Sequence, residues 1–238
     1  MDKEALAQYI GNNEMISRLF EENERIIRNA GYKPPCENYA VEREKRVNVP
    51  SGYVRTSGEF WNKYHLAEIV CERNVRNNIS YALQLSDYYN FILNRFNVWG
   101  SIEIMLYKQA FINIVSIIEA LILESSSRIN LHCQKCKDIG KCKNNICKYD
   151  RDNMKNAAEK LYELGVLKLT KTELDRLVEL YDYRNKIHIR LNVQNEFLDR
   201  KYNQSLYNET IGLMQKIDDA LWKYAVPLYS GCIGFERK

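Results

Sequence analysis

The chain has 238 residues, of which 45% are hydrophobic and 28% charged, and its formal net charge is +4. This balance is that of an ordinary soluble globular protein with one large domain or two small ones. The acidic, amphipathic N-terminus excludes a secretory signal, and the longest apolar run, residues 110–123, is shorter than a membrane span. We therefore expect a soluble, cytoplasmic protein with no membrane partner.

The first third of the chain predicts helices separated by one irregular connection. Amphipathic periodicity predicts a helix over residues 3–29 with a break near Gly11. Residues 31–58 hold three of the four prolines and are typical of an irregular connection. From residue 59 to 96 the pattern is again helical, and we expect two segments that meet around residues 74–78.

A second group of helices is predicted from residue 102 onward, and no strand series interrupts it. Residues 102–128 are apolar almost all round a helix, which predicts a central, buried element. The chain as a whole is therefore expected to be all-α. The remaining predicted helices run over 152–164 with an end near Gly165, from the capping-box pair Thr170 and Glu173, and over 203–225.

Four of the seven cysteines cluster with the spacing C-x2-C-x5-C-x4-C. Four thiolates within fifteen residues predict a tetrahedral, structural Zn²⁺ site, in which metal binding and loop folding are coupled. An iron–sulfur cluster and free thiols are the alternatives, and His132 is an alternative ligand. No HExxH element accompanies the cysteines, so a catalytic metal is not expected. The predicted ligands are Cys133, Cys136, Cys142 and Cys147.

The same segment carries the net charge of the chain. Residues 131–151 hold six basic side chains against Asp138 and Asp150, and this excess of four equals the excess of the whole chain. Such a basic surface predicts contacts with the phosphates of an RNA backbone, and a solvated or dimer-edge surface is the alternative. The predicted RNA-binding residues are Lys135, Lys137, Lys141, Lys143 and Lys148.

The stretch YDYRNKIHIRLN, residues 181–192, places three strongly polar groups at the end of a helix. On a helical wheel, Asn185 and His188 continue the apolar stripe that begins at Leu174, and Arg184 lies beside it. An arginine and a histidine four residues apart form a permanent cation next to a side chain that titrates near neutral pH. This pair suits the handling of a phosphodiester; helix capping or a buried hydrogen-bond network is the alternative.

Two segments resemble the HEPN superfamily, the higher eukaryotes and prokaryotes nucleotide-binding domain. LYELGVLKLTKTELDRLVELYDYRNKIHI (161–189) is similar to its closing half, and FINIVSIIEALIL (111–123), with Ser116 and Glu119, is similar to an earlier core helix. The resemblance covers about residues 80–225. It implies a HEPN-like helical bundle over 58–238, with an N-terminal helical extension and connection over 1–57 and the zinc-binding loop, 131–150, inserted between bundle helices.

The resemblance also implies an activity. Members of this superfamily are metal-independent endoribonucleases that cut RNA by 2′-OH attack at a site shared by two subunits, and some serve as toxins or in antiviral defence. Carried over, His188 is the general acid or base, Arg184 holds the scissile phosphate, Asn185 orients the site and Glu119 pairs with Arg184. The implied partners are RNA, a second copy of the chain, and an antitoxin or regulatory protein.

Non-catalytic relatives supply the alternatives, namely an RNA- or nucleotide-binding module or a regulatory interaction subunit. Two features depart from the family pattern. Three residues separate Arg184 from His188, where four to six are usual, and Arg190 occupies the position at which some toxins carry a modified tyrosine. His65, among aromatic neighbours, is expected to be a packed core histidine.

Overall fold

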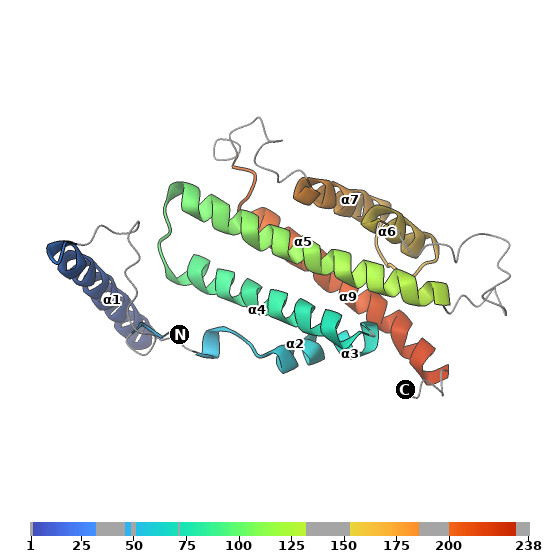
Figure 1. Ribbon diagram of the computed structural model, residues 1–238, viewed down its shortest axis with the longest axis horizontal. Helices are drawn as coiled ribbons and strands as arrows, with labels where there is room; N and C mark the ends of the chain where they lie inside the picture. The colour runs from blue at the N-terminus through green and yellow to red at the C-terminus, as the bar shows by residue number, and fades with distance from the viewer. Residues whose placement is uncertain are drawn as a thin grey trace. The chain divides into compact units, whose positions relative to one another are not determined.

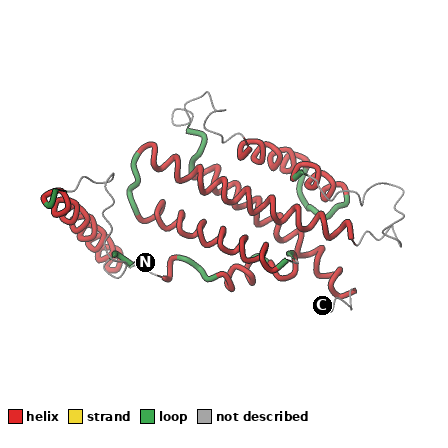
Figure 2. Tube along the Cα trace, in the orientation of Figure 1, coloured by secondary structure: helices red, strands yellow, loops and turns green. Residues whose placement is uncertain are grey.

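The computed structural model describes residues 2–31, 46–48, 51–70, 72–131, 153–185 and 200–231. Every regular element within these ranges is a helix, which confirms the predicted all-α class (Figure 2). The chain divides into two compact units, Met1–Val49 and Pro50–Lys238.

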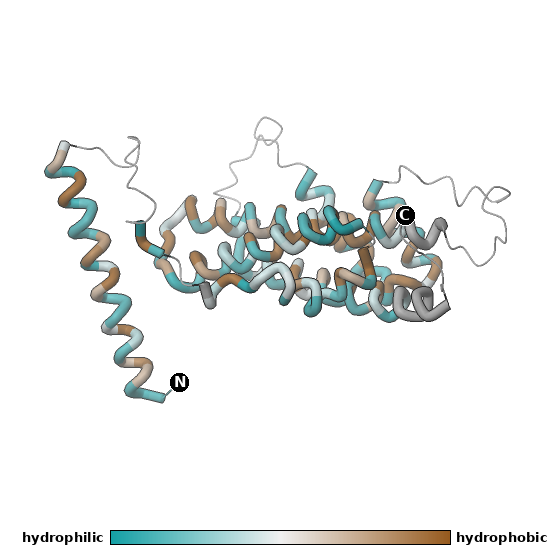
Figure 3. Tube along the Cα trace, turned by 60° about the horizontal axis from the view of Figure 1, so that its bottom comes forward, coloured by the Kyte–Doolittle hydropathy of each residue, from teal (hydrophilic) through white to brown (hydrophobic). Residues whose placement is uncertain are grey.

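The first unit contains one long amphipathic helix, α1 (Lys3–Asn29). Asp2 caps it, because its Oδ1 accepts a hydrogen bond from the backbone N–H of Ala5 at 2.7 Å. The helix continues through Gly11, so the predicted break there was wrong. A single glycine costs a helix interior only about 1 kcal/mol, and the amphipathic pattern continues on both sides of it. Figure 3 shows apolar and polar residues alternating in short blocks along α1.

The second unit begins with the short elements η2 (Ser51–Tyr53), α2 (Ser57–Lys63) and α3 (Leu66–Ile69), followed by α4 (Arg73–Arg95). The helical stretch is therefore interrupted between α2 and α4, and the predicted junction at residues 74–78 was wrong. The first interruption falls at His65, which has a left-handed backbone with φ of 44°. This unit begins at Pro50, and the backbone N–H of Arg55 links its first residues to Asp87 of α4.

Helix α5 (Gly100–Leu131) is the centre of this unit, as the sequence predicted. It packs against α4, α6, α7 and α9, and Figure 1 shows α4 and α6–α7 on opposite sides of it. Its buried side chains include Ile114, Ile118 and Leu121. Residues 100–127 are also long and apolar enough to cross a membrane, and 56% of the apolar stretch is buried within the protein.

Three further helices complete the described bundle: α6 (Met154–Glu163), α7 (Lys171–Asn185) and α9 (Gln204–Gly231). Two predicted boundary signals are confirmed. Gly165, with φ of 68°, follows the end of α6, and its N–H donates to the carbonyl of Tyr162 at 2.9 Å. Thr170 and Glu173 form a reciprocal capping box at the start of α7, with hydrogen bonds of 2.8 and 3.2 Å.

Candidate functional site

Arg184, in the last turn of α7, forms an ion pair with Glu119 of α5. The guanidinium Nη2 lies 3.1 Å from Glu119 Oε2, and the Tyr181 hydroxyl donates to the other carboxylate oxygen at 3.1 Å. Arg184 Nη1 also donates to the side-chain oxygen of Asn185 at 3.1 Å. The structure therefore brings together three of the predicted site residues, Arg184, Asn185 and Glu119.

The packing of α7 explains why Arg184 reaches α5. Leu174, Leu177 and Leu180 are all buried, so one face of α7 is fixed against the bundle. Arg184 follows Leu177 by seven residues, which is two helical turns, and so lies near the same face. Its side chain is 30% exposed and that of Glu119 20% exposed. The ion pair is thus partly shielded from water, and part of the Arg184 side chain stays exposed.

This arrangement is suited to holding an anion. A guanidinium has five N–H donors in a planar fork, and the contacts to Glu119 and Asn185 involve one nitrogen each. Glu119 fixes the position of Arg184, and the remaining donors can bind a phosphate. Sequence reasoning did not foresee the role of Tyr181; its three-residue spacing to Arg184 was the available signal.

The other predicted site residues lie outside the described ranges. These are His188, the proposed metal ligands and the proposed RNA-binding lysines, namely Cys133, Cys136, Cys142, Cys147, Lys135, Lys137, Lys141, Lys143 and Lys148. Within the described ranges, histidine, cysteine and acidic side chains form no group of three or more that could hold a metal ion. The zinc assignment therefore stays a prediction.

A second ion pair, which the sequence did not predict, joins the start of the unit to α4. Asp87 is 8% exposed and accepts from the backbone N–H of Arg55 at 3.0 Å and from its Nε and Nη2 at 2.9 and 2.6 Å. Burial alone would raise the pKa of the Asp87 carboxyl, but the hydrogen bonds and charge of Arg55 lower it below its ordinary value. The guanidinium of Arg55 donates to both carboxylate oxygens of Asp87. This ion pair is therefore a structural link between the start of the unit and α4.

His65 is half-buried and packed, as the sequence predicted. Its ring stacks on Trp222 with a centroid distance of 4.1 Å, and its Nδ1 lies 3.1 Å from Asp218 Oδ2. Asp218 is only 2% exposed, and burial raises its pKa to about 6 despite the hydrogen bond and charge of His65. The left-handed backbone of His65 is strained for a residue with a side chain, and these contacts to α9 hold it.

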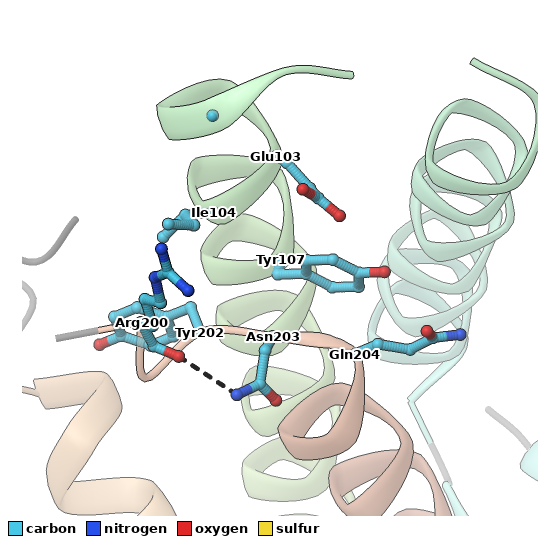
Figure 4. A pocket seen from close by; sticks show the side chains of 8 residues that line it. Glu103, Ile104, Tyr107, Arg200, Tyr202, Asn203 and Gln204 are labelled. Atoms are coloured by element: carbon cyan, nitrogen blue, oxygen red, sulfur yellow. Dashed lines mark hydrogen bonds between the residues drawn. The ribbon is translucent and has the colours of Figure 1, made fainter. Parts of the chain in front are cut away.

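A hollow of about 470 Å³ lies between the first turns of α5 and the residues that lead into α9. Figure 4 shows Glu103 and Tyr107 of α5 together with Arg200 and Tyr202 around it. Arg200 has a φ of 44°, and Asn203 donates to its carbonyl oxygen at 3.1 Å. Burial and the charge of Glu103 raise the pKa of Tyr107. No sequence motif marked this hollow, because its two sides are nearly a hundred residues apart.

The fold and the site together define an all-α protein with a partly exposed, carboxylate-anchored arginine at the end of a bundle helix. Comparisons with family models, curated proteins and solved structures give no match to this chain. The resemblance to the HEPN superfamily therefore stays an interpretation of the sequence motif.

Proposed function

We propose that the chain is a metal-independent endoribonuclease of HEPN type. The observation that supports this most is the Arg184–Glu119 ion pair at 3.1 Å, because it joins the two segments on which the resemblance depends. A fixed, partly exposed guanidinium is what stabilisation of a phosphorane-like charge requires. His188 follows Arg184 by four positions in the sequence and supplies a group that titrates near neutral pH.

In this mechanism the nucleophile comes from the RNA itself. His188 removes the proton from a ribose 2′-hydroxyl, or donates a proton to the departing 5′-oxygen, with the second copy of His188 in the dimer serving the other role. Arg184 binds the non-bridging oxygens of the phosphate while the 2′-oxygen attacks the phosphorus. Asn185 and Glu119 position the guanidinium. The products carry a 2′,3′-cyclic phosphate and a free 5′-hydroxyl.

The test is cleavage of single-stranded RNA by the full-length chain in the presence of EDTA. We expect products with 2′,3′-cyclic phosphate ends. His188→Ala should reduce the rate by roughly 10²–10⁴-fold, the usual contribution of a general acid or base. RNA binding by this variant should be retained, which separates the loss of chemistry from the loss of the complex.

Arg176 provides a matched control for Arg184, since it lies two turns earlier on the same helix and its guanidinium pairs with Glu209 at 2.7 and 2.9 Å. Arg184→Ala should lower cleavage, and Arg176→Ala should leave it unchanged. Two results would refute the proposed nuclease activity. One is that the wild-type chain leaves RNA uncut under all buffer conditions, and the other is that His188→Ala cuts RNA as fast as wild type.

A second candidate function is nucleotide or RNA binding without catalysis, and the hollow beside α5 favours it. Its volume lies within the range of small-ligand sites, and it presents tyrosine rings together with the guanidinium of Arg200. A base could stack on Tyr107 while Arg200 binds a phosphate. If the chain binds without catalysis, the wild type should bind RNA or a mononucleotide without cutting it. Arg200→Glu should then weaken this binding more than Arg184→Ala does.

A further inference from the structure

Helix α1 has a broad apolar face that the other described residues of its unit do not bury. None of its residues is buried. Seven of its large apolar side chains are between 43% and 62% exposed, namely Leu6, Ile10, Met15, Ile16, Leu19, Phe20 and Ile26. At 100° per residue most of them fall on one side of the helix, while Glu14, Arg18 and Arg25 lie on the other. A helix of this kind is stabilised by a partner that covers the apolar side.

The face repeats every seven residues, which is the pattern of a helix that pairs with another helix. Leu6, Asn13, Phe20 and Ile27 are spaced by seven, and so are Tyr9, Ile16 and Asn23. In heptad terms they are the a and d positions of a two-helix seam. Two of these seven central positions are asparagines. Against a purely apolar surface each buried amide would cost roughly 1–3 kcal/mol, so the partner should offer amides at matching positions.

A second copy of α1 offers such amides in an antiparallel register. In an antiparallel pair, each a position faces a d position of the other helix. The numbers of two facing residues then have a constant sum, which is 36 when Asn13 faces Asn23. The pair Asn13 and Asn23 then also sets Phe20 against Ile16 of the other copy and Ile27 against Tyr9. Each amide is then matched with an amide, and four of the five large apolar seam residues are matched with one another; Leu6 lies opposite Ala30, just past the end of α1. A single asparagine layer is known to fix register in such pairs, and here there are two.

The helix dipoles favour this direction over a parallel pair, because opposed dipoles attract and parallel ones repel. The acidic residues do not distinguish the two directions. Glu21 and Glu22 lie at the b and c positions of the heptad, away from the seam, and Glu24 is paired with Arg28 of its own helix at 2.8 Å.

We propose that α1 is a self-association element that pairs with α1 of a second copy of this chain, antiparallel, with Asn13 opposite Asn23. The proposal rests on α1 alone and holds whether or not the chain cuts RNA. It gives the N-terminal unit a role in self-association, which is separate from the RNA cleavage proposed at the end of α7.

The experiment is a measurement of the dissociation constant for self-association of the full-length chain by analytical ultracentrifugation. Phe20→Glu places a carboxylate in the central layers of the seam and should weaken self-association at least tenfold. Ala7→Glu adds the same side chain to the charged side of the same helix and should change it by less than twofold. Circular dichroism should show equal helix content in both variants.

A charge exchange tests the register. Asn13→Lys alone and Asn23→Glu alone should each weaken association. The double variant should restore it, because in the antiparallel pair the new ammonium faces the new carboxylate twice. In a parallel pair each new charge would face its own copy, and the double variant would be weaker than either single one.

The proposal is wrong if the wild-type chain stays monomeric, or if Phe20→Glu associates as tightly as Ala7→Glu. The first result would mean that α1 covers its apolar face in some other way, and the second that copies meet through another surface. Failure of the double variant to recover would overturn the antiparallel register. The two proposals are separated by different variants: loss of cutting in His188→Ala tests the nuclease, whereas loss of association in Phe20→Glu tests the α1 pair.

Discussion

Asp218 shows how strongly one buried carboxyl can link the stability of this bundle to pH. Its Oδ2 contacts His65, while its Oδ1 has no hydrogen-bond partner among the described residues. Burial raises its pKa from an ordinary value of 3.8 to about 6. Because the folded state binds this proton more tightly than the unfolded chain, the resulting stabilisation is complete below pH 3.8. It is lost as the pH rises through about 6.

Asp218→Asn should remove this dependence. We expect the stability of wild type relative to this variant to fall by on the order of 3 kcal/mol between pH 4 and pH 7, as a shift of about two pKa units implies. Urea denaturation followed by circular dichroism at several pH values would measure it. Asp219→Asn is the control, since Asp219 is the exposed neighbour on the same helix. Parallel curves for wild type and Asp218→Asn would contradict the prediction.

For individual residues, the sequence predicted only the contacts between residues that belong to a recognised motif. The pairing of Glu119 with Arg184 could be anticipated because each residue lies in a segment that resembles a known family. The Tyr181 hydroxyl, by contrast, lies on an apolar stripe where a tyrosine and a phenylalanine give the same pattern. The ion pair of Arg55 with Asp87 spans 32 residues and leaves no periodic signal. Its existence depends on how α4 packs, which local sequence does not encode.

Among the elements, those defined by local chemistry were predictable. The capping box of α7 and the glycine after α6 each rest on hydrogen bonds within a few residues, and both were placed correctly. The two errors concern interruptions. Gly11 was given too much weight as a helix breaker. The turn at His65 was missed because its left-handed backbone is held by Trp222 and Asp218, more than 150 residues away.

The capping box of α7 should contribute measurably to stability. Thr170→Ala removes the hydroxyl that accepts from the N–H of Glu173 at 3.2 Å and should destabilise the bundle by about 1 kcal/mol. The matched control is Thr172→Ala, which makes the same chemical change at an exposed position inside the first turn. The midpoint of urea denaturation reports the difference. Equal midpoints for the two variants would mean that the cap contributes nothing.

For the whole molecule, the predicted zinc site should be separable from the bundle. The described core comes from α2, α3, α4, α5, α6, α7 and α9 together with short connecting residues. Elemental mass spectrometry of the purified chain should give one zinc per chain. Serine at Cys133, Cys136, Cys142 and Cys147 should abolish zinc binding while the thermal unfolding of the bundle is largely preserved.

Two results would contradict this assignment. Iron with absorbance in the visible range would indicate a cluster instead, and a metal-free chain with titratable thiols would indicate free cysteines. A chain that unfolds entirely when zinc is chelated would mean that the segment supports the bundle. In that case the metal would be needed for the fold itself.

The length of α5 fixes the span between the two places where a ligand is proposed to bind. Tyr107 beside the hollow and Glu119 beneath Arg184 lie twelve residues apart on one unbroken helix, which at 1.5 Å per residue is about 18 Å. A mononucleotide is too small to bridge that gap. If the affinity rises sharply when the oligonucleotide is lengthened from one nucleotide to several, the hollow and the Arg184 site bind the same strand.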